Sequence, residues 1–73
     1  MKNAVTNKIK FHRQQAGMTQ SDLADCAGVS RQSIISIEKG QYVPSLPLAL
    51  KLAQIFKTST DNLFTLEDEP DDR

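Results

Sequence analysis

Two short helical patterns meet across one glycine-containing turn in residues 19–40, and this segment constrains the fold more than any other part of the chain. Thr19 is a favourable N-cap, and Asp22 follows three residues later, as in a capping box. Gly28 ends the first pattern where glycine tolerates a positive φ, and Ser30 caps the second. The apolar residues that recur at helical spacing are Leu23, Ala24, Ala27, Ile34 and Ile37. The segment therefore predicts two short helices joined by a tight turn.

The second of these helices begins with long polar side chains. Its polar positions are Arg31, Gln32, Ser33 and Ser36. Arg and Gln can each form two hydrogen bonds to a purine edge in the major groove of DNA. Such a helix pair is typical of a helix-turn-helix unit. Any helical hairpin needs the same caps and apolar stripe, so the residue pattern by itself leaves both interpretations open.

A helix is also expected near the N-terminus. Thr6 or Asn7 can cap it, and Gly17 would end it after Ala16. Its predicted inward stripe is Val5, Ile9, His12 and Ala16. Phe11 lies away from this stripe, which is weak support for a partner surface.

Two more helices and a strand are expected in the C-terminal half. Ser45 caps a fourth helix that accepts Pro47 in its first turn and runs to about Phe56. A short fifth helix is expected at residues 60–64, and residues 65–66 can extend as a strand. The fourth helix is apolar on two faces. Its predicted core stripe is Leu46, Ala49, Leu50, Ala53 and Phe56, and Leu48 and Ile55 lie on nearly the opposite side.

Composition limits the class of protein. Seventy-three residues form one small domain, so burial on dimerisation would add useful stability. No apolar run approaches about 20 residues, which argues against a membrane span, and no hydrophobic stretch follows Lys2 as in a signal peptide. A single cysteine, Cys26, and a single histidine argue against a disulfide, a zinc site or another metal site. No cofactor is expected, and a reducing cytoplasm is the natural setting.

The net charge of zero averages two unlike regions. Residues 1–57 carry eight Lys or Arg against three Asp or Glu, a net charge of +5. Residues 58–73 carry one Arg against six acids, a net charge of −5. The region with the helix pair is therefore basic, as a phosphate-facing surface requires. We expect a folded domain at residues 1–66 and an acidic, disordered tail at residues 67–73.

Several spaced motifs resemble the phage-repressor (XRE/Cro) helix-turn-helix family. The family pattern reads TQ-x-x-LA, G-V-S, R-Q-x-I-x-x-I-E-x-G and P-S-L-x-x-A-L-x-L-A. Here it occurs as Thr19-Gln20, Leu23-Ala24, Gly28-Val29-Ser30, Arg31 to Gly40 and Pro44 to Ala53. The resemblance covers residues 7–64. It implies a five-helix, all-α, lambda-repressor-like domain with a small terminal β-strand pairing.

The resemblance also implies which residues contact DNA. Arg31, Gln32 and Ser36 match positions that read base edges, with Arg31 suited to guanine and Gln32 to adenine. Gln20 matches a position that holds a phosphate and braces the recognition helix. The other implied phosphate contacts are Arg13, Ser30, Ser33, Lys39, Gln41, Tyr42 and Ser45. Arg13 further matches one member of a salt bridge with Glu38, a partly exposed pair whose value would be positioning.

Some of these residues have simpler interpretations. Arg31 can be a phosphate contact alone, Gln20 a solvent-exposed first-turn residue, and Tyr42 a cover for the edge of the core. Two positions depart from the family pattern. His12 stands where relatives have Leu or Ile, and Ile35 stands where they have a polar residue, which leaves the base code open.

Two interpretations of function follow, from different classes. The first is a homodimeric, sequence-specific DNA-binding transcriptional regulator of bacterial or phage type, in particular a repressor at an inverted-repeat operator. The alternative is an antitoxin-type protein-binding module whose acidic tail neutralises a basic toxin. An enzyme is not expected, since no motif has catalytic spacing. The predicted dimer interface is Leu48, Ile55, Leu63, Phe64 and Leu66.

Overall fold

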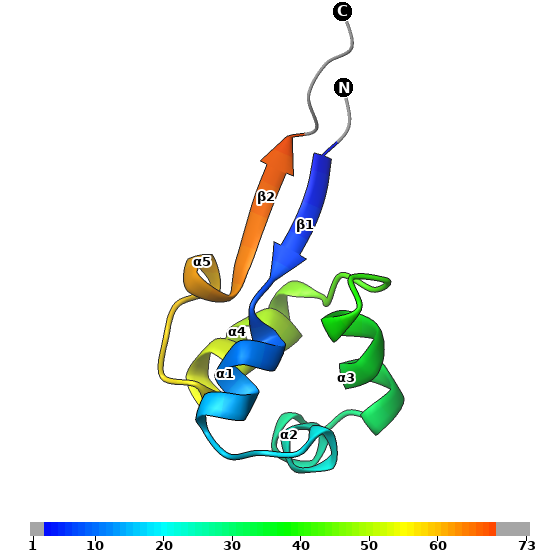
Figure 1. Ribbon diagram of the computed structural model, residues 1–73, viewed down its shortest axis with the longest axis vertical. Helices are drawn as coiled ribbons and strands as arrows, with labels where there is room; N and C mark the ends of the chain where they lie inside the picture. Colours follow the sequence, from blue (N-terminus) through cyan, green and yellow to red (C-terminus); the bar gives the residue numbers. More distant parts are fainter. Residues whose placement is uncertain (1–2, 69–73) are drawn as a thin grey trace, which may run out of the picture.

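The computed structural model describes residues 3–68. The described elements are β1 (Asn3–Asn7), α1 (Ile9–Gln15), α2 (Gln20–Ala27), α3 (Arg31–Glu38), α4 (Leu46–Ile55), α5 (Thr60–Leu63) and β2 (Phe64–Asp68). The helices pack together into one body, and the ribbon formed by β1 and β2 projects from it (Figure 1). The five helices and the small terminal strand pairing agree with the architecture that the sequence indicated.

The caps of the central helix pair confirm the local signals. Asp22 N donates to Thr19 Oγ1 (3.0 Å) and Thr19 N donates to Asp22 Oδ2 (2.9 Å), so the capping box is complete. Gly28 adopts φ +73° at the end of α2, a left-handed conformation that costs glycine little. Ser33 N donates to Ser30 Oγ (3.1 Å) at the start of α3. These bonds fix both ends of the turn between α2 and α3.

The N-terminal segment corrects the expected start of the first helix. Residues 3–7 form β1, so Val5 belongs to a strand opposite Leu66 and not to a helical stripe. The segment contains Val and Thr, which favour extended backbone once a partner strand is available. The helix begins at Ile9, whose N donates to Asn7 Oδ1 (3.1 Å), and it ends before Ala16. Ile9 is buried, but Ala16 is exposed.

The hydrophobic core lies between the helices. Its buried apolar residues are Ile9, Leu23, Ala24, Ala27, Ile34, Ile37, Leu52, Ala53 and Leu63. The inward face of α4 is thus rotated from the predicted one. Leu52 and Ala53 are buried, whereas Leu46 (69% exposed) and Leu50 face solvent. The two apolar faces of this helix made the sequence ambiguous, and packing against α2 and α5 selects between them.

The C-terminal strand is longer than predicted. It pairs antiparallel with β1 from Phe64 to Asp68, so backbone pairing continues two residues into the predicted tail. The backbone amides and carbonyls of each strand pair with those of the other, so the strand continues past its last apolar residue. The rest of the predicted tail, residues 69–73, lies outside the described residues.

Candidate nucleic-acid interface

Helix α3 presents the start of its polar face on the surface of the molecule. Arg31 and Gln32 are exposed at its N-terminal end, and Ser36 is half-buried one turn later. On the opposite side, Ile34 and Ile37 are fully buried. The helix is therefore anchored by its apolar face and leaves long polar donors free to meet a ligand. Ile35, the unusual apolar residue on this helix, is half-buried.

Four side chains form a connected network between α1, α2 and α3. Arg31 Nη2 donates to Gln20 Oε1 (3.3 Å), and Gln20 Nε2 donates to Glu38 Oε1 (3.2 Å). Arg13 grips the same carboxylate twice, with Nε to Oε2 at 2.7 Å and Nη2 to Oε1 at 3.2 Å. Gln20 therefore connects the first residue of α3 with the last one, as a brace does.

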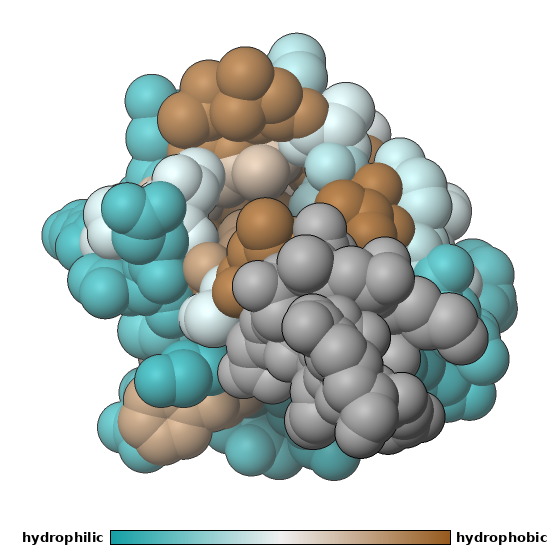
Figure 2. All heavy atoms as spheres, turned by 90° about the horizontal axis from the view of Figure 1, so that it is seen from above, coloured by the Kyte–Doolittle hydropathy of each residue, from teal (hydrophilic) through white to brown (hydrophobic). Residues whose placement is uncertain are grey.

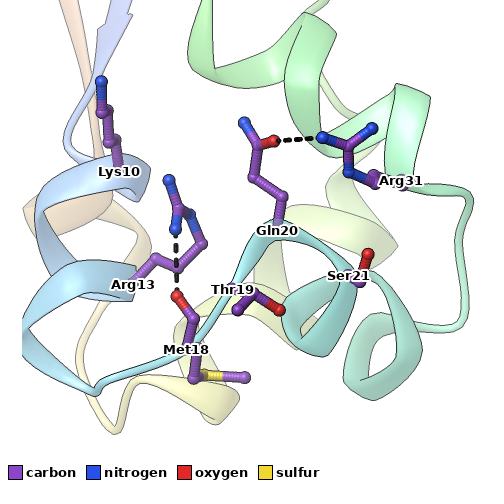
Figure 3. A pocket seen from close by; sticks show the side chains of 7 residues that line it. All are labelled: Lys10, Arg13, Met18, Thr19, Gln20, Ser21 and Arg31. Carbon is purple, nitrogen blue, oxygen red and sulfur yellow. Dashed lines mark hydrogen bonds between the residues drawn. The ribbon is translucent and has the colours of Figure 1, made fainter.

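The Arg13–Glu38 pair is more deeply buried than expected. The two side chains are 10% and 5% exposed, because α1 and α3 close over them. The hydrogen bond to Glu38 raises the pKa of Arg13 above its ordinary value, against the opposing effect of burial. Arg13 Nη1 also donates to Met18 O (3.0 Å) (Figure 3). The Arg13 guanidinium therefore bonds mainly to groups of the protein itself, and its main contribution is to hold α3 on α1.

An open hollow of about 620 Å³ lies beside this network (Figure 3). Three cationic side chains and the first turn of α2 border it, and we call it the cationic hollow. Its lining residues are Lys10, Arg13, Met18, Thr19, Gln20, Ser21 and Arg31. The first amides of a helix have no intrahelical acceptor, and the helix dipole favours a negative charge at this end. Cations and amides together suit a phosphate group.

Four residues that line this hollow were not among the predicted contacts: Lys10, Met18, Thr19 and Ser21. Lys10 lies three residues before Arg13, a spacing that places side chains on one side of a helix. That signal was present in the sequence. Ser21 follows Gln20 in the first turn of α2, where amides are free, so its position also could have been found from the cap at Thr19.

A second, smaller hollow of about 280 Å³ lies along α3 and the loop after it. Its lining residues are Ser30, Gln32, Ser33, Ser36 and Tyr42. The fold thus brings Tyr42 together with predicted contacts from α3, and its ring is 45% exposed. The exposure leaves the phenol accessible beside Gln32.

Three other predicted contacts lie apart from these hollows. Lys39 and Gln41 are exposed just beyond α3, and Lys39 borders the base of the ribbon. Ser45 is exposed, but its Oγ accepts a bond from Leu48 N (3.4 Å) and so serves as the cap of α4. The structure therefore places the predicted contacts in two groups near α3 and in a peripheral set.

The residues predicted for the dimer interface differ in their exposure. Leu63 is 1% exposed and belongs to the core of the protomer. Leu48 and Ile55 are half-buried and pack against the same core. Leu66 is 65% exposed, as the prediction requires, and Phe64 is half-buried beside it.

A groove of about 400 Å³ contains three exposed apolar residues, Val43, Leu46 and Leu66. It runs between β2, α5 and the start of α4, and its apolar lining residues are Val5, Val43, Pro44, Leu46, Ala49, Phe64 and Leu66. Figure 2, which looks at the molecule from the ribbon end, shows apolar side chains gathered on this side. We call this surface the apolar groove.

The fold and the exposed recognition helix define a helix-turn-helix domain, and comparison with known proteins agrees. Residues 9–63 match the helix-turn-helix family model HTH_3, so the chain belongs to that family. An uncharacterized HTH-type transcriptional regulator of Methanocaldococcus jannaschii is 51% identical over 63 residues, which is 86% of this chain and 96% of the relative. A similar protein of Bacillus subtilis, YgzD, is 46% identical over 63 residues, with the same two coverages.

A solved structure shares the fold. The restriction-modification controller protein C.AhdI of Aeromonas hydrophila superposes with a TM-score of 0.70 at 29% identity, over 75% of this chain and 83% of that one. The chain is thus a DNA-binding, helix-turn-helix transcriptional regulator by class. Its relatives include both archaeal and bacterial proteins, so the bacterial or phage type expected from the sequence stays a prediction. None of the helices in residues 3–68 is long and apolar enough to cross a membrane.

Proposed function

We propose that this protein is a homodimeric, sequence-specific repressor that binds an inverted-repeat operator in double-stranded DNA. The observation that carries the proposal is the placement of Arg31 and Gln32, exposed at the start of α3 beside the cationic hollow. A small domain that covers an operator acts most simply by excluding other proteins from that DNA. Since Cys26 is exposed and unpaired, we place the protein in the reducing cytoplasm.

Sequence readout is assigned to α3. When this helix lies in the major groove, Arg31 can donate two hydrogen bonds to O6 and N7 of a guanine, and Gln32 can pair with an adenine. Ser36, one turn later on the same polar face, reaches a neighbouring base. Arg31 must exchange its bond to Gln20 Oε1 for the base, and the 3.3 Å length and exposure of that bond make the exchange inexpensive.

Phosphate contacts surround this readout. The cationic hollow offers Lys10, Gln20 and the first amides of α2 to one phosphate. On the other side, the neighbouring backbone would meet Ser33 on α3 and the residues that follow this helix, Lys39, Gln41 and Tyr42. Ser30 and Ser45 are available through their exposed surfaces. Such contacts set the register of α3 and carry no base preference.

The apolar groove is the proposed dimer interface. A two-fold interface uses one patch twice, so Leu46 and Leu66 of each protomer are buried against the equivalent surface of a second copy. A single helix-turn-helix unit buries little surface on DNA, and a dimer doubles the contacts. Two half-sites about one DNA turn, roughly 34 Å, apart follow from the two-fold symmetry.

Selection of bound duplexes from a random pool tests the proposal directly. We expect enrichment of an inverted repeat with half-site centres about one turn apart. Affinity for the selected duplex should fall steeply with salt, because Lys and Arg contacts release counterions. Enrichment of no sequence, or of a single unrepeated half-site, would contradict a dimeric, sequence-specific regulator.

A further inference from the structure

The side chain of Asn7 links the β-ribbon to the recognition helix α3. This residue ends β1 and lies opposite Phe64, which begins β2. Its Nδ2 donates to Ile37 O at 2.8 Å, and its Oδ1 accepts from Ile9 N at 3.1 Å. The amide orientation is fixed by chemistry, since Ile37 O can only accept and Ile9 N can only donate. One side chain therefore connects the ribbon, the start of α1 and the end of α3.

The acceptor of the Asn7 amide, Ile37 O, lies in the last turn of the recognition helix α3. Ile37 O also accepts from Gly40 N (2.9 Å), so both of its lone pairs are used where α3 ends. The adjacent Glu38 is held by Arg13 and Gln20. The last turn of α3 is thus held at two points. Helices α1 and α2 bond to Glu38, and the ribbon bonds to Ile37.

The space around this bond is open. A hollow of about 230 Å³ lies between the base of the ribbon and the end of α3, lined by Val5, Thr6, Asn7, Glu38, Lys39 and Gly40. Apolar packing therefore does not fill this junction, and a directional hydrogen bond has more influence on the angle between the two elements than it would in a dense core. Lys8 N donates to Leu63 O (2.8 Å) and secures the other side of the ribbon to α5.

We propose that Asn7 is a positioning residue that fixes the angle between the β-ribbon and the recognition helix, and thereby the separation of the two recognition helices in the dimer. This inference rests on the proposed function, because it requires that the apolar groove beside the ribbon be the dimer interface. The part of the groove that belongs to the ribbon, including Leu66, is then coupled to α3 through Asn7. A rigid junction lets the dimer reject half-sites at the wrong separation.

The test separates this role from the local cap that Asn7 also provides. Asn7→Ser retains an oxygen that can accept from Ile9 N, but it lacks a donor that reaches Ile37 O. Asn62→Ala is the matched control, since it removes an exposed side-chain amide bond to Thr58 Oγ1 (2.9 Å) without touching α3. Both variants and the wild type are compared by sedimentation equilibrium, amide hydrogen exchange and binding to selected operators whose half-site separation is changed in single base-pair steps.

We expect all three proteins to be dimers with the same half-site base preference. The wild type and Asn62→Ala should lose about tenfold or more in affinity when the separation changes by one base pair, and Asn7→Ser should lose about threefold or less. Exchange of the Lys39, Gly40 and Gln41 amides, which close the end of α3, should accelerate in Asn7→Ser alone.

Each result bears on the inference in a defined way. A wild type without any spacing preference would contradict the proposed dimeric function and the inference together. An Asn7→Ser protein with unchanged exchange at α3 and the spacing preference of the wild type would overturn the inference and leave the proposed function intact. A variant that is merely less stable would show weaker binding at every separation, and this outcome also counts against a positioning role.

Discussion

At the scale of single residues, the recognition surface depends on which polar groups are free and which are already engaged. Arg31 and Gln32 are exposed, whereas Arg13 gives its guanidinium to Glu38 and Met18. The two arginines therefore have different roles. Arg31 makes one long internal hydrogen bond and is therefore available to bind a ligand. Arg13 makes three internal hydrogen bonds and therefore holds the helices together.

Replacement of Arg31 by alanine should reduce binding to the selected operator and relax the preference at one base pair of each half-site. Loss of a bidentate contact to guanine is expected to cost about 1–3 kcal/mol. Competition between the selected and random duplexes measures this. Lys39→Ala is the comparison, because a phosphate contact weakens binding to both duplexes alike. An equal loss on both duplexes for Arg31→Ala would make Arg31 a phosphate contact only.

Removal of one member of the Arg13–Glu38 pair should be more damaging than removal of both. Arg13→Met leaves a carboxylate in a site where its side chain is only 5% exposed, at an expected cost of about 3–5 kcal/mol. The double replacement with Glu38→Leu avoids the uncompensated charge and should recover much of that loss. The free energies of unfolding in urea of the wild type, the two single variants and the double variant form a double-mutant cycle. Additive losses would show that the pair does not act as a unit.

At the scale of elements, the caps decide where the central helices begin and end. The capping box at Thr19 and Asp22 pairs the Asp22 amide in the first turn of α2, the same turn that borders the cationic hollow. A frayed first turn would therefore disturb both the helix and the surface offered to a phosphate. Gly28 completes the turn to α3 in a conformation that other residues rarely adopt.

The capping box should make stability depend on pH in the acid range. Hydrogen bonds from Thr19 lower the pKa of Asp22 below the ordinary aspartate value. Because the folded value is lower than the unfolded one, the stabilisation is complete above the unfolded pKa, near about 4, and is lost as the pH falls through the folded value. Thermal unfolding of Asp22→Asn between pH 5 and 2 should show a smaller decrease in Tm than the wild type. Asp25→Asn, an exposed replacement on the same helix, is the control and should follow the wild type.

At the scale of the whole molecule, the ribbon and the helical body form one apolar surface that neither presents alone. Leu66 comes from β2, Leu46 from α4 and Val43 from the loop before it, and all three are exposed. Their convergence gives the surface that we assign to the second protomer.

A charge introduced into the apolar groove should separate the protomers and leave each one folded. In an isologous interface the new carboxylate lies close to its own copy, so Leu46→Asp and Leu66→Asp should sediment as monomers, keep helical circular dichroism and lose most operator affinity. Phe11→Asp is the control, because Phe11 is exposed on α1 and does not line the groove. Dimers of wild-type affinity in both groove variants would refute this interface.

The sequence by itself determined the helices that carry strong local signals. The caps at Thr19, Ser30 and Ser45, the glycine at position 28 and the apolar spacing placed α2, α3 and α4 correctly, because each signal acts within about one helical turn. Tertiary structure alone decided the rest. Residues 3–7 became a strand because residues 64–68 are available to pair with them, and a partner about 60 residues away cannot be inferred from the local pattern. The face of α4 that is buried and the burial of Leu63 likewise depend on which helices pack together, since a helix with two apolar faces is resolved only by its neighbours. The family resemblance indicated the Arg13–Glu38 pair, but its depth of burial depends on how α1 packs against α3.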